Sequence, residues 1–277
     1  MKLKKILFSS TFITIVWIVL LCSIWELEAL HIEQIKRTPE KVFPHLMQIF
    51  ESIADPKIIS NDQTSIELVL TNAYATLERA GIGFLIGALS GFILALLMKF
   101  SGIIEKIAFP YLMLIQMIPI LGMAPIVFAI TQDIGVSRIV ISGVLTFYPV
   151  AANTLAGLKS VSAENENLFR SYSANVFQTY TKLYIPTSIP FLFTGLKISA
   201  PLAITASILV DTLQGGVGLG CLLSQSLKGG MSPFVFWQII FLSAAIGILS
   251  LQVMVIAEKI IMSHKVRWNR EKNKNLI

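Results

Sequence analysis

The residue types that most often carry out enzymatic chemistry are sparse in this sequence. The three histidines lie far apart, with no H-E-x-x-H pair and no cluster at metal-ligand spacing. The two cysteines can build neither a disulfide framework nor a structural zinc site. No segment fits G-x-x-x-x-G-K-[ST], the loop that holds nucleotide phosphates. We therefore expect no catalytic constellation, no metal site and no nucleotide site on this chain.

Two features stand out against this background, a glycine-rich segment at 215–220 and a lone charge at Lys197. The segment fails G-x-G-x-x-G because Cys221 and Leu223 stand where the last Gly would fall, which favours a turn or a re-entrant segment. Lys197 interrupts an apolar run, and at mid-bilayer its charge would cost about 3 kcal/mol. The side chain must therefore either meet protein, water or phosphate groups, or snorkel to the membrane surface.

The overall composition indicates that the solvent of this chain is partly lipid. Of its 277 residues, 55% are hydrophobic and 14% are charged, whereas a soluble domain has roughly 25% charged residues. Exposing that much apolar area to water would cost about 25 cal/mol per Å². The composition therefore excludes a soluble globular enzyme, and the same richness in apolar residues excludes a disordered chain.

Six apolar runs are long enough to cross a bilayer as helices, which takes about 20 residues each. They are residues 6–25, 80–98, 107–132, 139–158, 190–210 and 229–257. None alternates with period two, which disfavours a β-barrel. The predicted inner loops and termini hold fourteen Lys and Arg residues and the outer loops hold seven, with Lys197 set aside. By the positive-inside rule both termini face the cytoplasm. The net charge of +6 then reflects orientation in the membrane and not nucleic-acid binding.

We expect one transmembrane domain over 1–277, with an uncleaved first span and an extracytoplasmic loop at 26–63. This loop has mixed charge and is too small for a core of its own. Thr64 followed by Glu67 predicts a capping box that starts the helix of the second span.

The predicted cytoplasmic segments are a loop at 159–189 and a basic tail at 263–277. The loop has a helical pattern over 164–182, and Pro186 and Pro190 should close that helix. An exposed helix of this kind is either a docking surface or a simple connector. The tail contains Trp268 among its basic residues and is typical of a membrane-surface anchor.

Small residues and prolines mark two of the spans. Gly83, Gly87 and Gly91 recur every four residues, which predicts a face for close helix packing in lipid. The third run contains Pro119 and Pro125 in its interior. Proline frees a backbone carbonyl and kinks a helix, so this span should be buried and could line a pore.

Short motifs follow one another along these spans. They are Thr76-Leu77-Glu78-Arg79 with Gly83-Phe84, Ile118-Pro119 with Ala124-Pro125, Phe147-Tyr148-Pro149 with Asn153-Thr154, Ile185-Pro186 with Pro190, Gly195-Leu196-Lys197-Ile198, and Gly218-Leu219-Gly220. In this order they resemble the permease subunits of binding-protein-dependent ABC importers. The resemblance covers about residues 38–268, with its core at 64–262. It is greatest to the subgroup that imports aliphatic sulfonates, taurine, nitrate and related anions, or thiamine-pyrimidine precursors.

The resemblance implies an all-α polytopic membrane protein with the type I ABC importer permease fold in the bacterial inner membrane. Its partners would be ABC ATPase subunits, an extracytoplasmic substrate-binding protein and a second permease copy in a homodimer. ATP and Mg would bind the ATPase and no cofactor would bind this chain. Substrate would cross by alternating access. The candidate pathway or gate residues are Met117, Pro119, Pro125, Asn153, Lys197, Thr205 and Asp211.

The cytoplasmic loop departs from the family's E-A-A-x-x-x-G coupling motif. Ser173 stands at the position of the Gly, and Asn167-Leu168-Phe169 replaces E-A-A. The Gly permits a sharp bend that Ser adopts only with strain. The candidate ATPase-coupling residues are Asn167, Leu168, Phe169, Tyr172, Ser173, Ala174, Phe177, Pro186 and Pro190.

Two other classes of membrane protein fit the sequence less well. An ion-coupled secondary transporter usually shows intramembrane carboxylates and inverted repeats, and neither is visible. A membrane-embedded enzyme would need His, Asp or Glu at membrane depth, which the spans lack except at their edges. We therefore expect a permease subunit that has no ATPase motif of its own.

Overall fold

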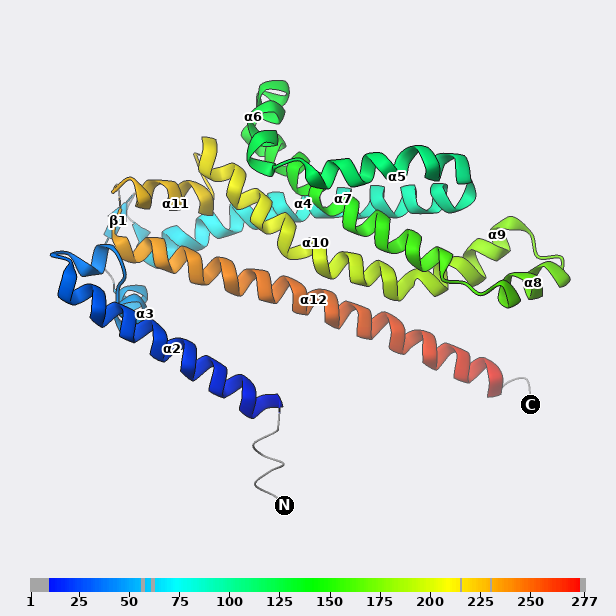
Figure 1. The fold of residues 1–277 in the computed structure, drawn as a ribbon, viewed down its shortest axis with the longest axis horizontal. Helices are drawn as coiled ribbons and strands as arrows, with labels where there is room; N and C mark the ends of the chain where they lie inside the picture. The colour runs from blue at the N-terminus through cyan, green and yellow to red at the C-terminus, as the bar shows by residue number, and fades with distance from the viewer. Residues whose placement is uncertain (1–9, 56–57, 61–62, 215, 230, 275–277) are drawn as a thin grey trace, which may run out of the picture. The chain divides into compact units, whose positions relative to one another are not determined.

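The computed structural model describes residues 10–55, 58–60, 63–214, 216–229 and 231–274, most of them in helices (Figure 1). Its elements are α2 (Ser10–Ile35), η1 (Pro39–Lys41), α3 (Leu46–Ala54), β1 (Ile58–Ser60), β2 (Gln63–Thr64), α4 (Ser65–Phe100), α5 (Gly102–Met117), α6 (Ile120–Thr131), α7 (Ile134–Lys159), α8 (Ala163–Ser171), α9 (Val176–Thr179), η2 (Tyr180–Tyr184), α10 (Ile185–Gln214), α11 (Leu219–Leu227) and α12 (Pro233–Lys274). β1 and β2 form one short antiparallel pair. The side chains from residue 264 onwards, which carry the charges of the predicted membrane anchor at 263–277, lie outside the described part of the chain.

Within the described residues, five helices are long and apolar enough to cross a membrane, and α5 with α6 makes a sixth span only as a pair bent by 108°. Figure 1 shows α6 turning away from the line of α5. The all-α polytopic fold is confirmed, and the run at 107–132, expected to be kinked by its prolines, is broken into two helices at Pro119. Ile118 has an extended backbone with ψ 124° because the ring of Pro119 disfavours helical geometry in the residue before it.

The first helix is longer than the sequence suggested. α2 continues to Ile35, so the predicted loop at 26–63 begins later than expected. Residues 26–35 contain neither Gly nor Pro and include Glu26, Glu28 and Glu33, which are good helix formers. Charge ends the apolar run, but it does not end the helix.

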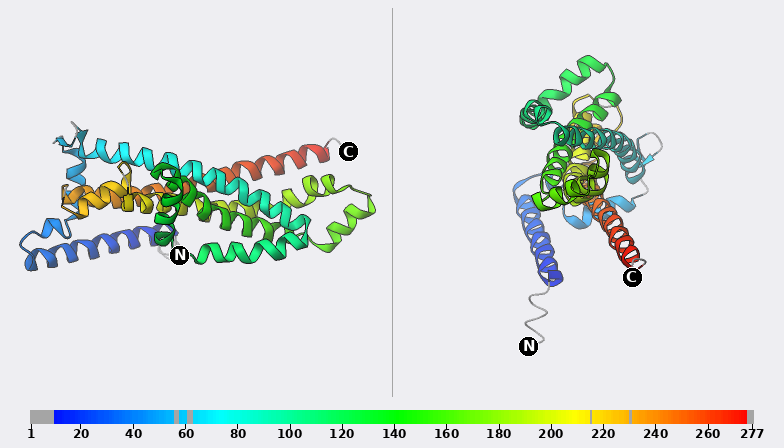
Figure 2. Two further views of the ribbon diagram at one scale, coloured as in Figure 1. Left: turned by 90° about the horizontal axis from the view of Figure 1, so that it is seen from above. Right: turned by 90° about the vertical axis from the view of Figure 1, so that its right-hand side faces the viewer.

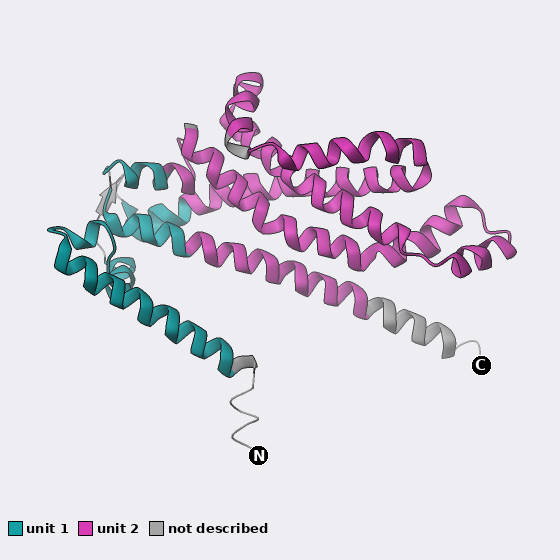
Figure 3. Ribbon diagram, viewed as in Figure 1, with its two compact units in different colours: residues 1–71, 222–241 teal, residues 72–221, 242–277 magenta. Residues whose placement is uncertain are grey.

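The chain divides into two compact units, which are described separately (Figure 3). Unit 1 comprises residues 1–71 and 222–241. In it the ring of Trp25 lies 4.2 Å from that of Phe43 and 4.9 Å from that of Trp237, measured between centroids. His45 begins α3, and its Nδ1 lies 2.6 Å from a carboxylate oxygen of Glu26. This hydrogen bond raises the pKa of His45 above its ordinary value.

The capping box predicted at the start of the second span is present in unit 1. The Thr64 backbone N–H donates to the Glu67 carboxylate at 2.9 Å, and the Glu67 N–H donates to the Thr64 hydroxyl at 3.4 Å. Two N–H groups that the first helical turn leaves without partners are satisfied in this way. The helix starts where the sequence predicted.

Unit 2 comprises residues 72–221 and 242–277, and its centre is formed by α4, α7 and α10 (Figure 2). The four-residue step of glycines on α4 lies against α7. A Cβ atom on Gly83 would lie 2.5 Å from the Ile139 carbonyl oxygen, and one on Gly91 would lie 2.7 Å from that of Phe147. Only a helix face without side chains allows the two backbones to come this close.

The segment before α10 also differs from its prediction. The single helix expected over 164–182 is broken into α8 and α9, and Pro186 and Pro190 do not close it, because the chain continues through η2 into α10. η2 is a π-helix in which the Ile185 N–H donates to the Tyr180 carbonyl. Pro186 has no N–H to give to the carbonyl four residues earlier, so the wider turn carries the helix past it.

The glycine face of α4 can be tested by adding one methyl group. Gly83→Ala should destabilise the protein by about 1–3 kcal/mol, because its Cβ would meet α7 backbone. Gly81→Ala is the matched control, since nothing lies within 4 Å of its Cβ position, and it should gain about 1 kcal/mol of helix propensity. The measurement is the midpoint of thermal unfolding of the purified protein in detergent. Equal midpoints for the two variants would contradict this packing.

Candidate functional site

The break between α5 and α6 opens a cavity of about 530 Å³ in unit 2. It is bounded by the end of α5, the middle of α7 and one face of α10. Its lining residues are Ile115, Gln116, Met117, Ile118, Pro119, Val144, Leu145, Tyr148, Pro149, Ala152, Asn153, Ile198 and Leu202. This volume lies within the roughly 300–1,000 Å³ that is common for small-molecule sites.

The structure gathers three of the predicted pathway residues around this cavity, namely Met117, Pro119 and Asn153. Thr205 does not line it, but it lies on α10 one turn beyond Leu202, on the same helix face. Its exposed hydroxyl donates to the Pro201 carbonyl at 3.0 Å. Pro125 lines a separate cavity of about 130 Å³ together with Phe128 and other residues.

The two charged pathway candidates are held in ion pairs away from this cavity. Lys197 pairs with Glu258 of α12, and the two side chains are 26% and 17% exposed. Asp211 pairs with the guanidinium group of Arg138 on α7, and both residues are almost completely buried. A partner on a neighbouring helix lets each of these charges remain in an apolar environment.

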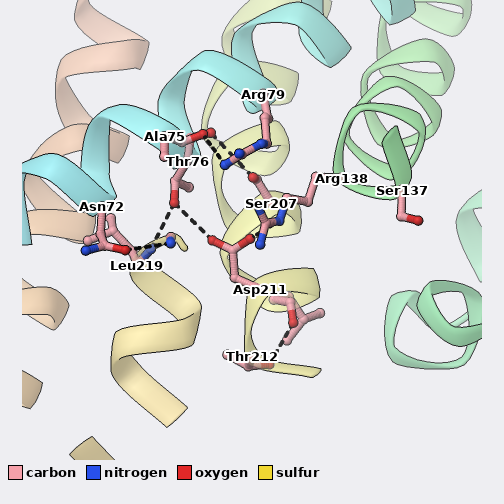
Figure 4. A network of polar contacts seen from close by, with 12 residues as sticks. Asn72, Ala75, Thr76, Arg79, Ser137, Arg138, Ser207, Asp211, Thr212 and Leu219 are labelled. Carbon is pink, nitrogen blue, oxygen red and sulfur yellow. Dashed lines mark hydrogen bonds and ion pairs between the residues drawn. The ribbon is translucent and has the colours of Figure 1, made fainter. Parts of the chain in front are cut away.

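Asp211 is the centre of a polar network between α4, α7 and α10 (Figure 4). Besides Arg138, it accepts hydrogen bonds from the Thr76 hydroxyl at 3.0 Å and from the Gly220 backbone N–H. The Ser207 hydroxyl donates to the Thr76 carbonyl at 3.4 Å. Two hydrogen-bond donors and one counter-charge let the buried carboxylate remain charged, so this network holds α4, α7 and α10 together.

The same network fixes the Gly218-Leu219-Gly220 turn. The Gly218 N–H donates to the Asn72 side chain at 2.7 Å, and the Leu219 N–H donates to the Thr76 hydroxyl at 2.9 Å. Gly218 has φ 136°, and a Cβ atom on it would collide with the Asp211 carboxylate. The glycines of this motif are therefore required because the backbone itself wraps around Asp211.

The predicted coupling loop contains a well-formed helix end at Ser173. Ser173 has φ 52°, its N–H donates to the Arg170 carbonyl at 2.9 Å, and the Ala174 N–H donates to the Phe169 carbonyl at 3.0 Å. These two bonds make a Schellman motif with Ser173 at the left-handed position. The bend usually made by Gly is thus present here with a serine.

Most of the predicted coupling residues lie on the surface of this loop. Exposed side chains come from both sides of the bend, at Asn167, Leu168, Tyr172, Ser173 and Phe177. Phe169 and Ala174 line a cavity behind them with Tyr184. Pro186 and Pro190 lie half-buried in the first turns of α10.

Glu166 joins this loop to two of the long helices. Its carboxylate accepts from the Tyr184 hydroxyl at 2.8 Å and from the Lys99 ammonium at 3.2 Å, and Lys99 also lies 4.3 Å from the centre of the Tyr184 ring. These contacts, that of Tyr184 foremost, hold the pKa of Glu166 below its ordinary value. α8 is therefore attached to the end of α4 and, through η2, to the start of α10.

Residues 83–261 match the family model described as the binding-protein-dependent transport system inner membrane component. The chain belongs to this family of ABC importer permeases. It is 31% identical to the formylaminopyrimidine transport permease protein ThiX of Halalkalibacterium halodurans, over 88% of this chain and 92% of that protein. It is 26% identical to the nitrate import permease protein NrtB of Leptolyngbya laminosa, over 68% and 67% of the two chains.

A solved structure supports the same fold. A chain described as an amino acid ABC transporter with histidines has a TM-score of 0.60 to this permease, with 19% identity, covering 70% of this chain and 94% of the other. Membership of the family makes this permease a multi-pass transport protein of the inner membrane. Its family depends on a binding protein and on ATPase partners.

The sequence alone missed several residues that contact the predicted site residues or hold the α8–α9 loop in place. They are Asn72, Thr76, Arg138, Glu166, Tyr184 and Glu258. The sequence could have indicated that Lys197 and Asp211 each have a partner of opposite charge, because a charge in an apolar span needs one. Which charge pairs with Asp211 or Lys197 depends on which helix faces meet, and no local pattern encodes that.

The Arg138–Asp211 pair can be tested by removing one charge and then both. Arg138→Met should destabilise the permease by about 3–5 kcal/mol, because it leaves a buried carboxylate without its counter-charge. Adding Asp211→Asn should restore most of the loss, since Asn keeps an acceptor for Thr76 and Gly220. Thermal unfolding in detergent measures both effects. A double variant no more stable than Arg138→Met would show that the pair is not the cause.

Proposed function

We propose that this permease forms half of a translocation pathway for a small solute that a binding protein delivers. The second half is a second copy of the chain, and two ATPase subunits bind ATP and Mg and drive the cycle. The observation that carries the proposal is the cavity at the helix break, which brings together Met117, Pro119 and Asn153 from separate elements. Backbone outside regular helix is tolerated at membrane depth only against protein or a wet cavity.

The substrate is a small organic anion, such as a sulfonate or nitrate-like ion, or a thiamine-pyrimidine-type precursor. The printed names of the relatives support both classes, because one is a formylaminopyrimidine permease, another a nitrate permease and a third, from Bacillus subtilis, a putative aliphatic sulfonates permease. In such systems the binding protein supplies much of the selectivity, and the pathway must accommodate what it receives.

Transport proceeds by alternating access. The ATPases dock on the apolar side chains of the α8–α9 loop, and ATP shifts the protein towards the outward-open state because that state binds the closed ATPase dimer more tightly. Tyr172 and Phe177 are 79% and 74% exposed, which suits an aromatic anchor for a partner surface. Glu166 transmits the displacement of α8 to α4 and α10, and Ile198 and Leu202 of α10 line the cavity.

The docking surface is tested by Phe177→Asp. This change should lower ATP-driven uptake by about tenfold or more in proteoliposomes that contain the permease, its ATPase and its binding protein, because it places a charge in a desolvated anchor position. Asn165→Asp is the control, since it adds the same charge at an exposed position of α8. Full uptake by Phe177→Asp would rule out docking at this surface.

Transmission through Glu166 is tested by Glu166→Gln, which weakens charged hydrogen bonds of about 1.5–3 kcal/mol each. We expect the ATPase to remain bound and to hydrolyse ATP while the number of substrate molecules imported per ATP falls several-fold. Glu164→Gln, two residues away and exposed, should leave this ratio unchanged. A merely structural role would lower binding, hydrolysis and uptake together and would contradict the assignment.

A further inference from the structure

We infer that the cavity behind the α8–α9 loop binds the headgroup of an anionic phospholipid, and that phosphatidylglycerol has the chemistry that fits it. The cavity has a volume of about 350 Å³ and lies in unit 2, between the end of α4, the loop and η2. The lining residues that carry the inference are Lys99, Phe100, Glu166, Arg170, Tyr180 and Tyr184. The inference concerns a ligand other than the transported solute and goes beyond the proposed function.

The cavity lies at the level where a bilayer has its phosphate groups. The charge-free run of α4 ends at Met98, and Lys99 is the first charged residue beyond it. Tyr180 and Tyr184 precede the apolar part of α10 in the same way. Amphipathic aromatic rings and basic residues concentrate at the membrane surface, where lipid headgroups contact both. A lipid can therefore reach this cavity from the headgroup layer.

The charges of these lining residues leave one positive charge for a phosphate group. Lys99 and Arg170 are cationic, and Glu166 is their one carboxylate among the lining residues. The Lys99 ammonium gives one of its three donors to Glu166 at 3.2 Å, so donors remain for a ligand. Arg170 is exposed and makes no side-chain hydrogen bond or ion pair within the described part of the chain. Its planar fork of N–H groups matches the oxygens of a phosphate.

The carboxylate of Glu166 distinguishes a glycerol headgroup from a bare phosphate ion. Glu166 accepts hydrogen bonds from Tyr184 and Lys99, and a carboxylate has about four acceptor positions. It would repel a free phosphate dianion, but it can accept from the two hydroxyls of a phosphatidylglycerol headgroup. The phosphate would then contact Lys99 and Arg170, and the hydroxyls would contact Glu166. Bound there, the headgroup would touch both α8 and the end of α4 and stabilise their attachment.

An exposed apolar stripe leads from the cavity along α4 and gives an acyl chain a surface to pack on. Phe100 lines the cavity, and Leu97, Ile93 and Leu89 follow it along the helix at steps of three and four residues. All four side chains are exposed, and residues at this spacing share one helix face. A water-soluble phosphate compound could not use this stripe. The stripe and the charged cavity together therefore favour a lipid over a soluble ligand.

The test measures lipid binding to the purified full-length permease in detergent by native mass spectrometry. The probes are dioleoyl-phosphatidylglycerol and dioleoyl-phosphatidylcholine. We expect the most tightly bound phosphatidylglycerol to have at least about fivefold higher affinity than phosphatidylcholine. Arg170→Gln should weaken its binding by about fivefold, because a basic residue near the membrane surface contributes about that factor. Arg170→Lys keeps the charge and should retain most of the binding.

Lys106→Gln is the matched control for Arg170→Gln. It removes an exposed positive charge near the start of α5, outside the cavity lining, and should leave the binding of phosphatidylglycerol unchanged. The midpoint of thermal unfolding without added lipid should be the same for both variants, since both side chains are exposed. Added phosphatidylglycerol should then raise this midpoint in Lys106→Gln and not in Arg170→Gln.

Four results would overturn the inference. They are equal binding of the two lipids, unchanged phosphatidylglycerol binding in Arg170→Gln, equal losses in Arg170→Gln and Lys106→Gln, and loss of the bound lipid when the ATPase is added. The last result would assign the cavity to the ATPase. Excess glycerol phosphate, the soluble headgroup, should not release the lipid, and its release would indicate a soluble phosphate compound instead. None of these measurements depends on transport, so the proposed function can fail or hold independently of them.

Discussion

A charge buried inside a protein must be neutralised where it lies, and the ion pair between Arg138 and Asp211 is the contact on which the centre of unit 2 depends. Because Asp211 also needs hydrogen-bond donors, Thr76 of α4 turns its hydroxyl inwards and the backbone of Gly220 comes within reach. The positions of α4, α7, α10 and the turn before α11 are therefore coupled through one carboxylate. This explains why the turn consists of glycines, since any side chain on Gly218 would occupy the space of the carboxylate itself.

Backbone N–H and C=O groups also find no hydrogen-bond partners in lipid, so they must be paired within the protein or meet water. Along α4 a continuous helix pairs these backbone groups. The glycine face of α4 then lets it pack against α7 without polar side chains. At Pro119 the pairing is solved differently, because the helix stops beside a cavity. A break of this kind is tolerable only where a polar solute or water replaces the missing donors.

The α8–α9 loop and the cavity are connected by helices that contact both of them. α8 is attached by Glu166 to Lys99 at the end of α4 and to Tyr184 in the π-helical turn before α10. α10 then runs on to Ile198 and Leu202 at the cavity. The π-helical turn is itself a consequence of Pro186, so the proline of the family motif shapes the joint between loop and span. The Schellman motif at Ser173 sets the direction in which the exposed aromatic residues are presented.

The sequence by itself determined the class of protein, most of the spans, the start of α4 at its capping box and the family. These properties depend on local composition, spacing and short motifs, which act over a few residues. It also located the left-handed position at Ser173, where the energetic cost is local to one residue. Only the tertiary structure decided that Lys197 pairs with Glu258 and that Asp211 pairs with Arg138. Those outcomes depend on which helix faces meet across 61 or more residues of chain, as for Lys197 and Glu258, and a pattern read along one helix contains no information about its neighbour.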